Sequence, residues 1–287
     1  MSESTYKFNA DAIGKWTPET RFEVEQDRLI AYAEATNDPI EEHRAGAIAA
    51  PVFAVVPIFD SLVGASLEVA PYQLIPRLVH GEQYFRYHRH IRPGDTLVSR
   101  AKPIGYQGLP NGTRGTVYAE TRDSSGELLN EQWVTFFFRK YDCGETVGDL
   151  GPKHGFDGPL AGYDPVMKLS QHIDADQTFR YAPAAGDPMP IHLDVDSAKA
   201  AGLPGIIAHG LCTMAFTSWA ALTELADSRT ERLRELAVRF AKPVLPDQDI
   251  ESAFWHSTSQ DGASSYVFQT TALGDLVIKD GLVVIDD

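Results

Sequence analysis

Two segments of the chain place apolar residues at helical spacing over several turns, and they lie in different halves of the sequence. They cover residues 55–70 and 209–226. Each is followed by runs with the alternation and the β-branched and aromatic content of strands, divided by turn sequences such as Arg92-Pro-Gly-Asp95. The pattern predicts a long helix followed by a meander of antiparallel strands, twice over. The expected strands are residues 79–90, 96–105, 113–123 and 128–139 in the first half, and residues 236–242, 249–256, 264–273 and 276–285 in the second.

A repeat at an offset of 149 residues supports this duplication. Residues 27–43 align without gaps on residues 176–192, with Asp, Tyr-Ala, Ala, Asp-Pro and His in common. Asp27 and Asp176 stand where each copy is expected to place the N-cap of a short helix. The prediction is an α+β fold in which each sheet wraps around its own helix and the two sheets join edge to edge.

The repeat divides the chain into three parts. Residues 1–141 form the first repeat and residues 166–287 the second. Residues 142–165 are rich in Gly, Pro and Asp, and this composition is typical of a linker.

Composition narrows the class of protein. With 287 residues and 43% hydrophobic content the chain has enough apolar residues for a proper core. Its net charge of −15 argues against broad nucleic-acid binding, which needs a basic face. No apolar run is expected to span a bilayer, and the first residues do not resemble a signal peptide, so a cytoplasmic protein without a membrane partner is predicted.

The cysteines offer neither a disulfide framework nor a metal site. Cys143 and Cys212 are the two present, and no paired Cys/His spacing indicates zinc. Cys212 lies in the second apolar helix, where a buried core residue is more common than a nucleophile. No metal is expected.

The candidate chemistry lies in the second repeat, between residues 181 and 213. Asp187 and His192 are five residues apart on a segment stiffened by proline, which is expected to be a loop. Gly210 follows at the start of the second long helix. With ordinary pKa values of about 3.9 and 6.5, the carboxylate is ionised and the imidazole mostly neutral near neutral pH, so both can accept hydrogen bonds from one water. The free N–H of Gly210 can stabilise an oxyanion. Together these groups can hydrate a polarised double bond.

Other polar residues have simpler interpretations. The first-repeat pair, Asp38 and His43, lacks the Gly at the helix start, so Asp38 is expected to be a turn residue and His43 to be solvated. His80 and His209 are each expected to anchor a loop or strand end by hydrogen bonding. The cationic run 86–92 is expected to keep its charged side in water, with attraction of an anionic ligand as the alternative.

Several motifs then carry a family resemblance. They are Gly186-Asp187-x-x-Pro190-Ile191-His192, Ala208-His-Gly-Leu-Cys-Thr213, Arg239-Phe-Ala-Lys-Pro243 and, in the first half, His80-Gly-Glu-Gln-Tyr84. In this order they resemble the MaoC-type, or hydratase 2, family, whose members have a double hot dog fold. The resemblance implies that the first repeat is degenerate and shapes an acyl tunnel, while the second is catalytic. The family has Asn where this chain has Met189, and methionine cannot donate a hydrogen bond.

The resemblance also implies an activity and a set of contacts. The activity is reversible hydration of trans-2-enoyl-CoA to (3R)-3-hydroxyacyl-CoA, with a medium to long acyl chain and without a metal or redox cofactor, since CoA is part of the substrate. A homodimer is compatible with the family. Asp187, His192 and Gly210 would be catalytic, and contacts to the CoA thioester are implied for Ala50, Pro51, Arg77, Pro188, Met189 and Phe240.

Two alternatives remain open from the sequence. The same chemistry could act on a branched, steroid side-chain or polyketide-type thioester. The chain could also be a non-catalytic subunit that binds acyl-CoA, because Met189 departs from the family pattern. A thioesterase, another activity of this fold, fits the motifs less well.

Overall fold

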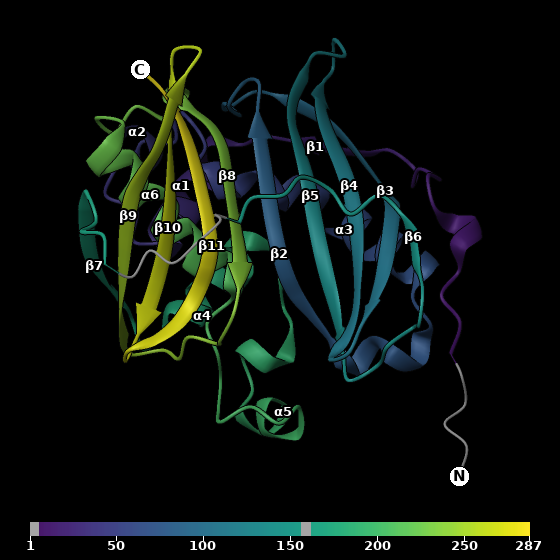
Figure 1. Cartoon of the computed structure of the whole chain (residues 1–287). Coiled ribbons are helices and arrows are strands. Elements are labelled where there is room, and N and C mark those ends of the chain that lie inside the picture. Colours follow the sequence, from purple (N-terminus) through teal and green to yellow (C-terminus); the bar gives the residue numbers. More distant parts are fainter. Residues whose placement is uncertain (1–5, 156–161) are drawn as a thin grey trace.

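The structure is a computed structural model that describes residues 6–155 and 162–287. Within these residues the strands form one 11-stranded sheet in the order β1-β3-β4-β5-β2-β8-β11-β10-β9-β7, with β6 paired to β3 (Figure 1). The strands are β1 (Thr20–Glu23), β2 (Leu78–Tyr87), β3 (Thr96–Leu109), β4 (Gly112–Asp123), β5 (Leu128–Arg139), β6 (Thr146–Gly148), β7 (Met167–Ile173), β8 (Leu233–Phe240), β9 (Gln248–Gln260), β10 (Ala263–Ala272) and β11 (Asp275–Asp286).

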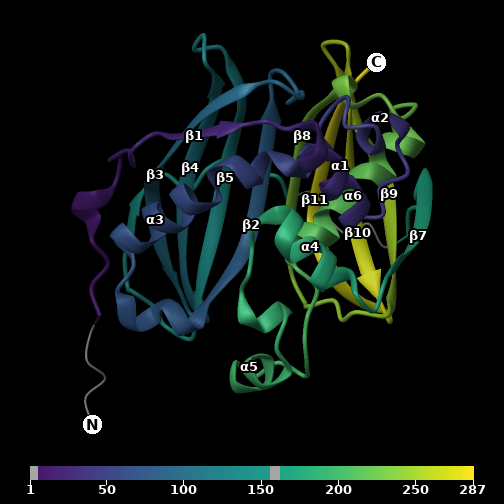
Figure 2. The ribbon, with the colours of Figure 1, turned by 180° about the vertical axis from the view of Figure 1, so that it is seen from behind.

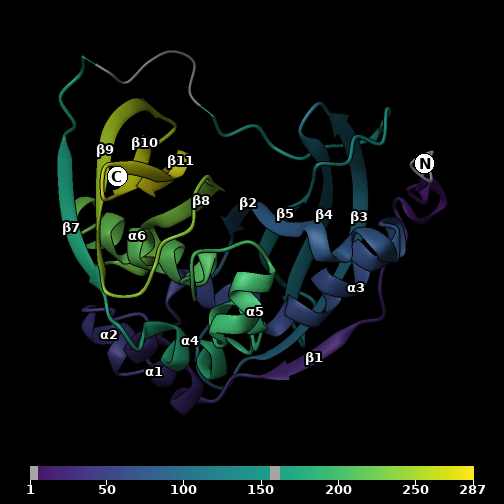
Figure 3. The ribbon, with the colours of Figure 1, turned by 90° about the horizontal axis from the view of Figure 1, so that it is seen from below.

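The helices pack on the concave side of this sheet. Seen from below, each half of the sheet curves around one long helix, α3 in the first half and α6 in the second (Figure 3). The α-helices are α1 (Gln26–Ala35), α2 (Glu41–Arg44), α3 (Phe59–Val69), α4 (Gln177–Ala185), α5 (Val195–Ala200) and α6 (Gly210–Leu225); the 3₁₀ helices are η1 (Ala10–Ala12), η2 (Pro51–Ile58), η3 (Tyr72–Arg77), η4 (Pro190–His192) and η5 (Thr230–Arg232).

The two halves join where β2 pairs with β8, in the middle of the sheet (Figure 2). In this antiparallel pairing Phe85 lies opposite Leu236, and both side chains are fully buried. Arg86 Nε donates to Glu235 Oε1 at 2.9 Å across the same junction. The predicted α+β double hot dog, with two sheets joined edge to edge, is therefore confirmed.

The predicted long helices are present, but the first differs from the expectation. Residues 51–58 form the 3₁₀ helix η2, and α3 begins only at Phe59. Pro57 lacks the N–H that an α-helix would need at this point, so the apolar periodicity continues while the hydrogen-bonding pattern changes.

The expectation about membrane spans needs a correction. Residues 51–69 are long and apolar enough to cross a bilayer by length and composition, with a mean hydropathy of 1.8. In the fold, 61% of this window is buried. Its apolar composition is thus accounted for by its place as the core helix of the first half.

Several short elements were not predicted. The strands β1 and β7 pair with β3 and β9 at the two outer edges of the sheet, and β6 lies within the segment expected to be a linker. Residues 156–161 of that segment lie outside the described residues. The helix α1 begins at Gln26 with Glu25 at its N-cap, so the N-cap assignment of Asp27 was wrong, whereas Asp176 does occupy the N-cap of α4.

Candidate active site

Asp187 is positioned by the end of α4. This helix continues to Ala185 although it contains Pro183, so the segment expected to be a loop is half helical. Gly186 ends it with φ of 73°, a left-handed conformation that glycine adopts without strain. The N–H of Asp187 donates to Ala182 O at 3.0 Å, and its half-buried carboxylate follows directly after this turn.

His192 stands at the end of η4 with a defined tautomer. Its Nδ1–H donates to the carbonyl of Ile207 at 2.9 Å, and the side chain is 8% exposed. The neutral ring therefore carries its lone pair on Nε2, which can accept a proton.

Asp187, His192 and His209 come together although the sequence places them up to 22 residues apart. Their potential ligand atoms all lie within 4.8 Å of one another. Burial raises the pKa of Asp187, against the opposing effect of His192, and burial lowers the pKa of His192. Such a cluster can hold one small species, either a water that receives and donates hydrogen bonds or a metal ion.

His209 was expected to anchor a loop, and it does so inside the site. Its Nε2–H donates to the backbone carbonyl of Asp187 at 3.2 Å, and its ring stacks on His192 with centroids 3.8 Å apart. Burial, followed by the proximity of His192, lowers its pKa to about 3, so His209 is neutral at physiological pH. We interpret it as a positioning residue that sequence spacing alone did not reveal as part of the site.

This interpretation predicts the behaviour of a conservative variant. His209→Phe keeps an aromatic ring on His192 but loses the hydrogen bond to Asp187. We expect kcat/KM for an enoyl-CoA substrate to fall roughly tenfold, in line with the loss of one buried hydrogen bond. The pH–rate profile should also move, because the neighbour that lowers the pKa of His192 is gone. A variant that lost only thermal stability, with kinetics unchanged, would show a purely structural role.

Gly210 opens α6 beside the dyad. As the first residue of the helix, its N–H has no acceptor within the helix, and it lies at the positive end of the helix dipole. A Cβ at this position would lie 3.2 Å from the ring of Phe240, which comes from β8. Glycine is thus required for close packing here, and Phe240 lies beside the N–H as predicted for a substrate contact.

Met189 changes less than the sequence suggested. Its side chain is 49% exposed, and its backbone N–H donates to Asp187 Oδ1 at 3.2 Å. Among residues 6–155 and 162–287, the second oxygen of Asp187 has no protein partner. The loop contact is therefore supplied by the backbone, while the amide of the family Asn is missing. Pro188 lies between the two residues.

The remaining predicted contacts stay predictions. Ala50 and Pro51 are buried at the start of η2, where Pro51 O accepts from Tyr87. Arg77 donates to Lys140 O at 2.9 Å and is not simply solvated. The cations of the 86–92 run are paired with carboxylates, as for Arg92 with Glu231 at 2.7 Å, which leaves them less suited to attract an anion.

The equivalent pair in the first repeat is closed by hydrogen bonds. His43 is fully buried rather than solvated, which corrects the expectation. Its Nδ1 lies 2.7 Å from Asp38 Oδ2 and its Nε2 lies 2.6 Å from Thr230 Oγ1. Because Thr230 belongs to the second repeat, this buried group ties the two halves together and leaves no room for a water on Nε2.

Comparison with known proteins agrees with this geometry. The family described as MaoC like domain matches residues 159–275, and the one described as FAS1-like, dehydratase domain region, matches residues 11–129. A 3-hydroxyacyl-thioester dehydratase Y of Mycobacterium tuberculosis is 30% identical over 249 residues, covering 81% of this chain and 80% of that protein. The peroxisomal multifunctional enzyme type 2 of Drosophila melanogaster is 27% identical over 238 residues, which are 76% of this chain and 38% of that enzyme. The mouse enzyme of the same name is covered to 31%, so the chain spans about a third of these longer relatives.

Solved structures show the same architecture. A MaoC-like dehydratase from Phytophthora capsici superposes with a TM-score of 0.84 at 21% identity, covering 97% of this chain and 98% of that one. The fold and the acid–imidazole pair beside a helix start define the class of double hot dog hydro-lyases, which add water to a double bond or remove it. The chain belongs to the MaoC-like dehydratase family, and its relatives include hydratase 2 enzymes.

Proposed function

We propose that the chain interconverts trans-2-enoyl-CoA and (3R)-3-hydroxyacyl-CoA. The observation that carries this proposal is the half-buried pair of Asp187 and His192 beside the free N–H of Gly210. Relatives named enoyl-CoA hydratase 2 and 3-hydroxyacyl-thioester dehydratase support a thioester substrate of this kind. The 3R configuration is the stereochemistry that the family resemblance implies.

The reaction uses one water and no other co-reactant. The water hydrogen-bonds to the free oxygen of Asp187 and to Nε2 of His192, and its oxygen attacks Cβ of the enoyl group. The dyad accepts one proton from the water and returns a proton to Cα from the same face, so the addition is syn and gives one enantiomer. The dyad is treated as a unit because its two groups titrate together.

Negative charge develops on the thioester oxygen while the Cβ–O bond forms. The N–H of Gly210 donates to this oxygen, and the N-terminal end of α6 stabilises the charge. The neutral His209 adds no cation that would hold the water or the enolate too tightly. A water rather than a metal ion completes the site in this mechanism, because a water supplies both the hydroxyl group and the proton.

The pKa shifts predict a pH dependence. Asp187 must be ionised and His192 neutral, so protonation of either stops the reaction. Because the pKa of Asp187 is raised from 3.8 and that of His192 lowered from 6.5, we expect kcat/KM to fall on the acid side with an apparent pKa between these values. Activity should be at its plateau at neutral pH. An acid limb above the ordinary pKa of histidine would contradict this assignment.

A line of aromatic contacts leads from the dyad toward the first repeat. The ring of Phe240 lies beside Gly210 and 5.0 Å from that of His80, and His80 in turn lies 5.9 Å from Phe136. Burial lowers the pKa of His80 to about 4, so it is an uncharged member of this line. Phe136 borders an apolar cavity of about 10 Å³ between α3 and the sheet. This is the direction in which the acyl chain is proposed to run.

The first experiment follows the conjugated enoyl-thioester absorbance with crotonyl-, trans-2-octenoyl- and trans-2-dodecenoyl-CoA. We expect all three to be hydrated and the product to be 3R. A 3S product would overturn the stereochemical part of the proposal. Saturable binding of the three thioesters without turnover would instead show a non-catalytic acyl-CoA-binding subunit, and release of free CoA thiol would show a thioesterase.

A further inference from the structure

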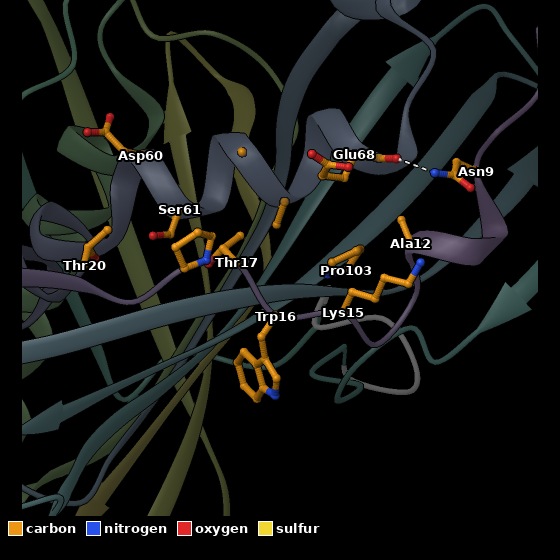
Figure 4. A pocket seen from close by; sticks show the side chains of 13 residues that line it. Asn9, Ala12, Lys15, Trp16, Thr17, Thr20, Asp60, Ser61, Glu68 and Pro103 are labelled. Atoms are coloured by element: carbon orange, nitrogen blue, oxygen red, sulfur yellow. Dashed lines mark hydrogen bonds between the residues drawn. The ribbon is translucent and has the colours of Figure 1, made fainter.

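A groove of about 500 Å³ lies on the outer side of the first repeat, away from the dyad. It runs between α3 and the N-terminal segment that contains η1 (Figure 4). Asp60, Ser61 and Glu68 line it from the helix, and the opposite wall includes Ala12, Lys15 and Thr17 (Figure 4). Much of the surface between these polar rims is made of small or apolar groups, namely Ala12, Trp16, Pro18, Gly64, Ala65 and Pro103.

The groove is continuous with the apolar cavity described above. Pro103 lines both spaces, and consecutive residues of α3 alternate between them, with Ala65 facing the groove and Ser66 the cavity. The N-terminal segment does the same, because Phe8 lines the cavity while Asn9 lines the groove.

The cavity itself is too small for a long acyl chain. Its volume of about 10 Å³ is close to the minimum for one water. Phe8 occupies part of the space beside it, 7% exposed and packed against Phe138 with centroids 5.4 Å apart. The larger space at this end of the path is the groove.

The geometry points to the groove as the site that receives the distal end of a long acyl chain, once Phe8 moves aside. This inference rests on the proposed function and specifies its substrate class as thioesters with chains longer than the interior holds. The occupant is apolar and enters from within, because the cavity that joins the groove is lined mainly by apolar side chains. The acidic rim formed by Asp60 and Glu68 disfavours the phosphates of CoA, which places the CoA end at the dyad.

Two substitutions test the site in opposite directions. Gly64 lines the groove, and no atom lies within 4 Å of a Cβ built there, so Gly64→Trp fills the groove without a clash in the core. We expect the ratio of kcat/KM for trans-2-hexadecenoyl-CoA to that for crotonyl-CoA to fall about tenfold, the effect of losing the burial of about two methylenes. Phe8→Ala should raise the same ratio by widening the cavity.

Two controls separate filling of the groove from effects on the helix. Gly64→Ala changes helix propensity without filling the groove, and Val63→Trp adds the same ring at a 37% exposed neighbour outside it. Both should leave the ratio unchanged. If Gly64→Trp and Phe8→Ala also left it unchanged, while crotonyl-CoA was hydrated, the inference would be wrong and the proposed function would stand.

A binding measurement tests the site independently of catalysis. Trp16 lies at the groove, and the chain has four tryptophans, so its signal is the difference between wild type and Trp16→Phe. Saturated palmitoyl-CoA with bromine at the end of its acyl chain should quench most of this difference, and unlabelled palmitoyl-CoA should not. Binding without quenching would exclude the groove whether or not enoyl-CoA is turned over, and absence of turnover alone would refute only the hydratase assignment.

Discussion

Asp187→Asn and His192→Gln should each lower kcat for enoyl-CoA hydration about a thousandfold, the range expected for the loss of a general acid or base. Both substitutions keep the size and polarity of the side chain but remove its ability to exchange a proton with the water. KM should change little, because neither group is proposed to hold the CoA moiety. The measurement is steady-state kinetics with crotonyl-CoA. Residual activity above a tenth of wild type would remove the residue from the proposed proton transfer.

The first repeat offers a matched control for these variants. Asp38→Asn and His43→Gln make the same substitutions at the equivalent positions, 149 residues earlier. Because His43 is fully buried between Asp38 and Thr230, we expect a loss of roughly 1–3 kcal/mol in the free energy of unfolding, as for buried polar groups left without a partner. The kcat per folded molecule should be unchanged. The two repeats would then show opposite patterns, activity lost in one and stability lost in the other.

Gly210→Pro should lower kcat about a hundredfold, the typical effect of removing one donor to a developing oxyanion. Proline removes the N–H and is well tolerated at the first position of a helix. The preceding residue, His209, already has φ of −61° and ψ of 134°, the extended conformation that proline favours before it. The helix should therefore persist, and circular dichroism together with thermal unfolding can verify this.

Gly210→Ala serves as the control for the added carbon. It places a Cβ 3.2 Å from the ring of Phe240 but keeps the N–H. We expect kcat to remain within roughly tenfold of wild type, since Phe240 is only partly buried and can shift. Equal losses in the Ala and Pro variants would show that packing, and not the hydrogen bond, accounts for the effect of Gly210.

The elements that could be predicted are those with a strong local pattern. The helix α6 and the strands β2 to β5 and β8 to β11 have many apolar positions at one period, because each must bury one face or stripe against the core. The strands β1, β6 and β7 are short, and they exist because a neighbouring strand offers its backbone groups. No local periodicity indicates such pairing. The change from η2 to α3 likewise depends on a single proline within an apolar run.

By itself, the sequence determined the duplication, the double hot dog fold and the candidate group of Asp187, His192 and Gly210, because these depend on motif spacing and local periodicity. Only the tertiary structure decided which polar residues are buried and what they contact. His43 and its partner Thr230 are 187 residues apart, and the contact of His209 with Asp187 forms only when α4 and α6 pack together. The groove beside α3 also arises from packing, since its walls come from segments whose own patterns give no sign of a shared surface.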